Sequence, residues 1–218
     1  MKTIAIAGST GYLGKYLVKH LVEQNISGVV LARNLDKLSE FKSKNLNFKR
    51  VELTQPETLN GVLNGVDTLI STIGITRQKD GLKYMDVDYQ VNADLLAEAQ
   101  KAGVKKFIYI SVLNGENMRH LKICEAKERF VDELKNSGMP YTIIRPSGFF
   151  SDMKDFLDMA QKGRVYLFGK GEYKINPIHG EDLAKVCFDA VLMDEPEIEV
   201  GGPDILTQNQ IAGLALQA

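Results

Sequence analysis

Short apolar runs alternate with amphipathic stretches along the first 150 residues of the chain. The run from Ile4 to Ala7 predicts a strand that is buried on both faces. The stripe that follows, formed by Leu13, Leu17 and Leu21, predicts an amphipathic helix. Five further strands are predicted at 28–33, 48–53, 67–74, 106–111 and 141–145.

Helical patterns separate these strands. We expect a short polar helix at 34–43, a helix from Gln55 onward, and two long helices at 87–102 and 119–137. The polar stretch at 75–83 is typical of a loop. Six strands that alternate with helices predict an α/β fold, a doubly wound parallel sheet of the Rossmann type.

The pattern changes after residue 150. We expect helices at 152–162 and 181–193, a glycine-rich turn region at 163–171, a short extended segment at 174–178 and a helix starting in 207–216. The sequence therefore predicts a Rossmann domain over residues 1–150. Residues 151–218 should form a small C-terminal cap on the substrate side, partly fused to the sheet.

Three glycines lie between the first strand and the first helix, at a spacing of three residues: Gly8, Gly11 and Gly14. The first permits a tight turn, the second lets the backbone approach a pyrophosphate, and the third lets the helix pack close to the strand. The helix N-terminus then faces the phosphates. A glycine turn that binds nothing is the alternative. We expect a dinucleotide site that includes Gly8, Ser9, Thr10, Gly11, Tyr12, Leu13 and Gly14, with Ser9 or Thr10 capping the helix or binding a phosphate oxygen.

Composition narrows the class of protein. The 218 residues carry a net charge of −1, so no nucleic-acid partner is expected. No apolar run is long enough for a membrane span or a signal peptide. The two cysteines, Cys124 and Cys187, have no paired spacing, which favours a reduced, cytoplasmic protein. The three histidines lack a second ligand at metal spacing, so no metal site is expected.

Several motifs together resemble the atypical short-chain dehydrogenase/reductase superfamily, closest to its NmrA-like, NAD(P)H-binding branch. Quinone-reductase-like and divinyl-reductase-like proteins are relatives of that branch. The motifs are GSTGYLG (8–14), LARN (31–34), DTLISTIG (67–74), KFIYIS (106–111), SGMPYTIIRPSGFF (137–150) and INPIHGEDLA (175–184). The family's substrate region continues beyond a segment like 201–207, so we expect either a naturally short protein or a truncated one.

The residue that ends the second strand selects the cofactor. An acidic side chain there binds the ribose 2′-hydroxyl of NAD, whereas an arginine pairs with the 2′-phosphate of NADP. Arg33 stands at this position, followed by Asn34 and Lys37. We expect the protein to prefer NADP(H), with NAD(H) as the second cofactor that it could bind. A solvated surface arginine is the alternative.

The resemblance implies further cofactor positions at the carboxyl ends of the strands. Leu53 and Thr54 should lie near the adenine, Thr72, Ile73 and Gly74 along the ribose, and Ser111 at the nicotinamide half. The loop that covers the nicotinamide should be formed by Pro146, Ser147, Gly148 and Phe149. The alternative to cofactor binding for Thr72 and Ser111 is that each hydroxyl forms hydrogen bonds only with nearby backbone groups.

Classical members of the superfamily place a tyrosine four residues before a lysine on one helix face, and the pair moves a proton. Lys127 matches the lysine, but Ile123 stands at the tyrosine position. The resemblance therefore implies Lys127, with Ser111, as the catalytic candidates. Lys127 should also bind the cofactor ribose. A solvated helix lysine is the alternative.

We interpret the chain as an NADP(H)-binding oxidoreductase that passes hydride to a planar conjugated acceptor, a quinone or an enone. Such an acceptor needs little acid catalysis. An apolar cluster that includes Met153 and Phe156 either lines its pocket or packs the cap. The alternative is a non-catalytic NADP(H)-binding redox sensor or regulator of the NmrA-like type. The expected binding partner is the small-molecule substrate. We also consider a homodimer, formed through the two long helices that end at Gly103 and Gly138.

Overall fold

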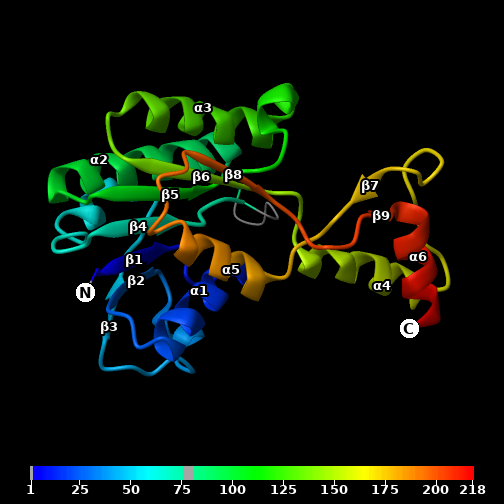
Figure 1. The fold of residues 1–218 in the computed structure, drawn as a ribbon, viewed down its shortest axis with the longest axis horizontal. Helices are drawn as coiled ribbons and strands as arrows, with labels where there is room; N and C mark the ends of the chain where they lie inside the picture. Colours follow the sequence, from blue (N-terminus) through cyan, green and yellow to red (C-terminus); the bar gives the residue numbers. More distant parts are fainter. Residues whose placement is uncertain (1, 76–80) are drawn as a thin grey trace.

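Seven parallel strands form the main sheet of the protein, in the order β3-β2-β1-β4-β5-β6-β8 (Figure 1). The structure is a computed structural model, and it describes residues 2–75 and 81–218. The strands are β1 (Ile4–Ala7), β2 (Gly28–Ala32), β3 (Leu46–Arg50), β4 (Thr68–Ser71), β5 (Lys106–Ile110), β6 (Tyr141–Pro146) and β8 (Glu197–Val200). The chain continues from β1 to β2 on one side and places β4 on the other. The expected doubly wound parallel sheet is confirmed, with its switch point beside β1.

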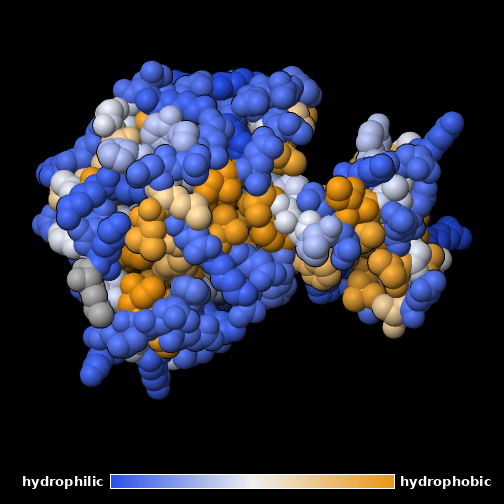
Figure 2. Space-filling view, in the orientation of Figure 1, coloured by the Kyte–Doolittle hydropathy of each residue, from blue (hydrophilic) through white to orange (hydrophobic). Residues whose placement is uncertain are grey.

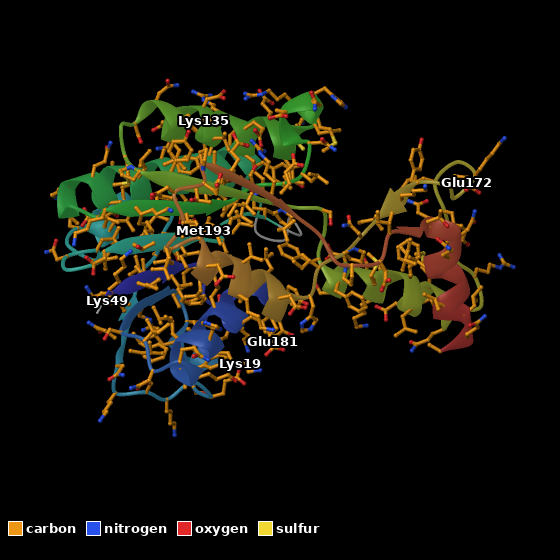
Figure 3. The ribbon with its side chains drawn as sticks, viewed as in Figure 1. Lys19, Lys49, Lys135, Glu172, Glu181 and Met193 are labelled. Carbon is orange, nitrogen blue, oxygen red and sulfur yellow. The ribbon has the colours of Figure 1, made fainter. Side chains whose placement is uncertain are left out.

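Helices cover both faces of this sheet (Figure 1). α1 (Tyr12–Glu23) and α5 (Gly180–Asp189) bury one face around residues such as Ile6, Leu17 and Leu183. α2 (Asn92–Ala102) and α3 (Lys122–Asn136) bury the other face. Lys19 of α1 and Glu181 of α5 lie side by side in Figure 3 and form an ion pair at 3.3 Å. The two core layers hold the strand ends in fixed positions.

A small lobe, which we call the C-terminal lobe, projects beside the sheet (Figures 1 and 2). It contains the 3₁₀ turn η5 (Phe150–Met153), α4 (Lys154–Ala160), β7 (Lys174–Ile175), β9 (Leu206–Thr207) and α6 (Gln208–Gln217). β7 and β9 pair antiparallel, and α4 packs on α6. Thr207 caps α6 in a capping box with Gln210. The boundary at residue 150 stays a prediction, and both α5 and β8 of the later segment join the main body.

The sequence pattern missed β8, although residues 197–200 pair in parallel with β6. This strand is short and carries two glutamates, so only Ile198 and Val200 provide an apolar alternation. The prediction of six strands was therefore one strand too few. The third strand also begins two residues earlier than predicted, at Leu46.

Three predicted helices differ in form. The helix expected at 34–43 is only the 3₁₀ turn η1 (Leu35–Leu38), in which the Asn34 side chain accepts from the Asp36 N–H and only Leu38 is buried. The helix from Gln55 is likewise the short turn η2 (Pro56–Leu59). Without a buried stripe, neither segment has a packing reason to extend. The helix expected at 87–102 begins as a π-helix, η3 (Met85–Val91). The loop expected at 75–83 falls mostly on residues 76–80, outside the described residues.

The described helices include none that is long and apolar enough to cross a membrane. Within residues 2–75 and 81–218, no three histidine, cysteine, aspartate or glutamate side chains gather closely enough to hold a metal ion.

Candidate functional site

A cavity of about 540 Å³ opens at the carboxyl ends of β1, β2 and β4, where the strand order reverses. In doubly wound proteins this is the position at which ligands bind. Nine of the predicted cofactor residues line the cavity: Gly8, Thr10, Gly11, Arg33, Leu53, Thr54, Thr72, Ile73 and Gly74. Residues of three sequence motifs, 8–14, 31–34 and 67–74, thus line one cavity, together with Leu53 and Thr54.

The glycine loop has the geometry that its spacing predicts. Gly8 adopts a φ of 84°, and a Cβ there would collide with the Thr72 hydroxyl. A Cβ at Gly14 would overlap the Gly8 carbonyl and lie 2.7 Å from the Cα of Ser9, so only glycine lets α1 pack this close to the loop. Gly11 precedes the first turn of α1 without any side-chain cap. The first-turn N–H groups, those of Tyr12, Leu13 and Gly14, therefore have no intrahelical partner.

Two hydroxyls of the loop region are already engaged in structural hydrogen bonds. The fully buried Ser9 Oγ donates to the Leu31 carbonyl at 2.7 Å. The Thr72 Oγ1 donates to the carbonyls of Ala7, at 3.1 Å, and Gly8, at 3.3 Å. The predicted helix cap by Ser9 or Thr10 is wrong, because Ser9 ties the loop to β2 and Thr10 makes no cap. These bonds hold the glycine loop between its two neighbouring strands.

The end of the cavity beside β2 and the segment after β3 carries one charge of each sign. Arg33 is exposed, and its Nη1 lies 4.0 Å from the Glu52 Oε2. Glu52 also accepts from the Thr54 hydroxyl at 2.8 Å. The sequence analysis missed Glu52, whose only signal was its place directly before Leu53 and Thr54. The other two predicted residues here lie outside the cavity lining, since Asn34 caps η1 and Lys37 is exposed.

A buried ion pair lies behind the far end of the cavity. The Lys127 Nζ lies 3.2 Å from the Oδ1 of Asp88, which is fully buried in the π-helix. The other Asp88 oxygen accepts from the Ile75 N–H at 3.0 Å. A Cβ at Gly74 would lie 2.6 Å from Asp88 Oδ1 and 3.0 Å from Lys127 Nζ. Gly74 therefore lets the cavity wall pass directly over this pair.

The neighbouring groups keep Lys127 protonated despite its burial. Burial lowers the pKa of this ammonium, but the neighbouring Tyr109 and Asp88 outweigh it and leave the pKa above its usual value. Burial also raises the pKa of Tyr109 to about 12, and its ring is fully buried under the Lys127 Nζ, 5.3 Å away. At neutral pH Lys127 can donate a hydrogen bond but cannot act as a base. Tyr109 has no exposed hydroxyl with which to replace the tyrosine that Ile123 displaces.

Ser111 lies in a buried network rather than in the cavity lining. Its hydroxyl donates to Glu128 Oε1 at 2.7 Å. Glu128 in turn accepts both Nη groups of Arg145, at 2.7 and 3.0 Å, and all three residues are buried. The Arg145 Nε donates to Glu197 at 2.8 Å. The sequence analysis missed this network, which fixes α3 and β8 against the end of β6.

The segment expected to cover the nicotinamide follows β6. Ser147 donates to the Asn176 carbonyl at 2.6 Å, and Phe149 packs edge-on against Tyr12 at 5.7 Å between ring centroids. The Tyr12 hydroxyl accepts from the Gly180 N–H at 3.1 Å. Tyr12 thus joins α1 to the start of α5 with its side chain, while Leu13 is buried in the core.

The Rossmann sheet, the glycine loop and the cavity at the switch point together define a class of protein. They are the features of an atypical short-chain dehydrogenase/reductase. The model of a family described as NAD(P)H-binding matches residues 8–194. The chain belongs to this NAD(P)H-binding family.

The chain is similar to curated proteins that have different roles. The chain is 31% identical over 186 residues to a photosystem II assembly factor of Guillardia theta, covering 84% of this chain and 58% of the relative. It is 25% identical over 224 residues to a divinyl chlorophyllide a 8-vinyl-reductase of Arabidopsis thaliana, covering 92% and 53%. It is 27% identical over 216 residues to an NAD(P)H azoreductase of Xenophilus azovorans, covering 96% and 71%. The chain spans little more than half the length of the first two relatives.

Solved structures share the fold. An NADPH-dependent quinone oxidoreductase from Escherichia coli, complexed with NADPH, has a TM-score of 0.82 at 22% identity, covering 98% of this chain and 74% of the other. A UDP-glucose 4-epimerase from Thermotoga maritima has a TM-score of 0.79 at 19% identity, covering 99% and 82%. At these identities the likeness concerns the fold alone.

Proposed function

We propose that this protein binds NADP(H) and passes hydride from NADPH to a planar conjugated acceptor. The observation that carries the proposal is the glycine loop, in which added Cβ atoms at Gly8 and Gly14 would collide with neighbouring atoms. Such a loop leaves its backbone and the α1 N-terminus open to a pyrophosphate. Membership of the NAD(P)H-binding family supports the same cofactor class.

Most of the predicted residues have a role in this proposal. The loop holds the pyrophosphate through the N–H groups of Tyr12, Leu13 and Gly14. Arg33, whose Nη1 lies 4.0 Å from Glu52, pairs with the 2′-phosphate. Leu53 and Thr54 border the adenine, and Thr72, Ile73 and Gly74 border the ribose. Asn34 and Lys37 lie outside the cavity lining, on the exposed surface around Arg33, and have no direct contact with the cofactor in this proposal.

When bound, NADPH would supply a hydride, two electrons with one proton, and the reduced acceptor would take its second proton from solvent. Lys127, as a buried ammonium paired with Asp88, donates a hydrogen bond toward the nicotinamide ribose or the acceptor oxygen. Ser111 fixes the end of β5 through Glu128. Pro146 to Phe149 covers the nicotinamide half. A conjugated acceptor suits this site because its reduced form is stabilised without a tyrosine acid.

The alternative is an NADP(H)-binding regulator or assembly partner without turnover. The relative at 31% identity is an assembly factor, and Ile123 removes the classical acid. The cytoplasmic location and the homodimer stay predictions.

Anaerobic NADPH oxidation, followed at 340 nm with a quinone and an enone acceptor, separates the two functions. Steady turnover that depends on both protein and acceptor is expected for the reductase. Tight NADPH binding without turnover over a broad panel of acceptors would contradict the reductase and favour the regulator.

A further inference from the structure

A second cavity, of about 350 Å³, lies between the ends of β5 and β6 and the C-terminal lobe. Leu113 and Asn114 follow β5, Ser147 follows β6, and the opposite wall comes from η5, α4, β7 and α6. In the strand order, β5 and β6 continue the edge on which the first cavity lies. A dinucleotide that binds with its adenine end at Arg33 extends along this edge toward the second cavity.

The walls of this cavity are mostly apolar. Leu113, Met153, Phe156, Ile175 and Ile211 line it. Several of its polar groups are engaged within the protein: the Ser147 hydroxyl donates to the Asn176 carbonyl at 2.6 Å, and the Gln208 Oε1 accepts from the Phe168 N–H at 3.1 Å. Such a surface suits an apolar ligand with few polar groups.

Asn114 stands out in this lining. It has a left-handed backbone, with φ 56° and ψ 19°, and its side chain forms no hydrogen bond with the described part of the chain. Asn25, the other described non-glycine residue with positive φ, closes the end of α1, and its Oδ1 accepts from Asn45. Local structure thus explains Asn25 but leaves the amide of Asn114 without a protein partner.

The backbone around Asn114 is fixed from both sides. The Leu113 N–H donates to the Pro146 carbonyl at 3.0 Å, and Arg145 donates to the Val112 carbonyl at 3.3 Å. Gly115 is buried, and a Cβ there would lie 2.5 Å from Glu128 Oε1. The buried Arg145–Glu128 pair therefore holds this loop and fixes the backbone of Asn114 at the cavity, where its exposed amide is open to a ligand. Strained and over-determined positions of this kind are typical of ligand sites.

A charge completes the recognition surface. Lys174 of β7 lines the same cavity, is exposed, and forms no hydrogen bond or ion pair through its ammonium with residues 2–75 or 81–218. No aspartate or glutamate is among the lining residues that surround it. An unpaired ammonium at the mouth of an apolar cavity favours an anionic group on the ligand.

We propose that the second cavity is the acceptor site and that it takes a planar apolar molecule carrying an anionic group. The Asn114 amide donates to an oxygen of the ring system, and Lys174 pairs with the anionic group. Planarity rests on the proposed hydride transfer, whereas the anionic group rests on the cavity itself.

The test measures binding by calorimetry on the full chain, with and without saturating NADP⁺, using two probes of similar shape. One is the anionic 1,4-naphthoquinone-2-sulfonate and the other is the neutral 2-methyl-1,4-naphthoquinone. Lys174→Gln is expected to weaken the sulfonate about 10-fold and the neutral probe less than about 2-fold, since it removes one charge-assisted contact. Lys170→Gln, on the same lobe but outside the lining, is the matched control and should change neither.

Asn114→Gly keeps the left-handed backbone and removes the amide. It should weaken both probes about 5-fold, the value of one hydrogen bond, without lowering thermal stability. Asn25→Gly makes the same change at the other left-handed asparagine and should leave both probes unaffected.

The outcomes separate this inference from the proposed function. NADP⁺ binding without any binding of the sulfonate, or sulfonate binding that neither Lys174→Gln nor Asn114→Gly weakens, would overturn the acceptor site and leave the cofactor assignment standing. Sulfonate binding with these sensitivities, in a protein that does not bind NADP⁺, would support the cavity and contradict the proposed function.

Discussion

At the scale of single residues, Gly14 is the glycine at which an added Cβ would approach backbone atoms most closely. A Cβ there meets backbone atoms of Gly8 and Ser9, which cannot move aside without opening the loop. Gly14→Ala should lower the free energy of unfolding by about 2–3 kcal/mol, the usual cost of overpacking, and should abolish measurable NADPH binding.

Gly213 provides the matched control. It lies inside α6, and nothing lies within 4 Å of a Cβ placed there. Gly213→Ala should raise the free energy of unfolding by about 0.5–1 kcal/mol, because alanine loses less backbone entropy in a helix. Urea unfolding of both variants measures the difference, and an equal effect of the two substitutions would show that the close packing at Gly14 is unimportant.

Arg33 carries the proposed choice between the two cofactors. Arg33→Glu should weaken NADPH binding at least about 10-fold, because it replaces a charge-assisted pair with repulsion, and should change NADH binding far less. Lys162→Glu, which makes the same charge change in the C-terminal lobe, is the control. A loss of equal size for NADPH and NADH would assign Arg33 to general surface charge.

Residue patterns predicted the geometry of the glycine loop better than the partners of each hydroxyl. The glycine spacing placed the loop correctly because backbone conformation follows directly from the missing Cβ. The hydroxyls of Ser9 and Ser111 were given ligand roles, yet they donate to Leu31 and Glu128. Such partners come from other strands and helices, and no local sequence signal marks them.

At the scale of elements, the Arg145–Glu128 pair links β6 to α3. Both side chains are buried, and removal of the Glu128 charge leaves Arg145 paired only with the more exposed Glu197 and Glu116. Glu128→Gln should therefore lower the free energy of unfolding by about 3 kcal/mol, the lower end for a broken buried pair. Asp132→Asn on the same helix is the control, because its ion pair with Arg119, which precedes α3, is exposed and should cost no more than about 1 kcal/mol. Chemical denaturation compares them, and similar losses would contradict the role of burial.

Elements with a continuous buried face were predicted well, and those without one were not. β1 and β2 are apolar throughout and β5 is apolar after Lys106, as strands covered on both faces should be. β8 is an edge strand with alternating glutamates, and η1 and η2 are turns with little buried surface. The π-helical start before α2 surrounds Asp88, whose partner Lys127 lies on α3, so its form depends on tertiary contact.

At the scale of the whole molecule, the two cavities share one edge of the sheet. Adenine binds at β2 and β3 in this account, pyrophosphate at the start of α1, and the acceptor beyond β5 and β6. The strand order thus places the proposed cofactor and acceptor sites next to each other. The sequence pattern predicted the doubly wound parallel sheet, but neither its strand order nor β8.

Calorimetric titration of the 218-residue chain with NADPH, and then with NADH, tests the central claim most directly. The account predicts binding of one NADPH per chain with micromolar affinity, and NADH binding at least about 10-fold weaker, as expected for one lost charge-assisted pair. Binding of neither nucleotide would contradict it, because the glycine loop would then be a structural turn only.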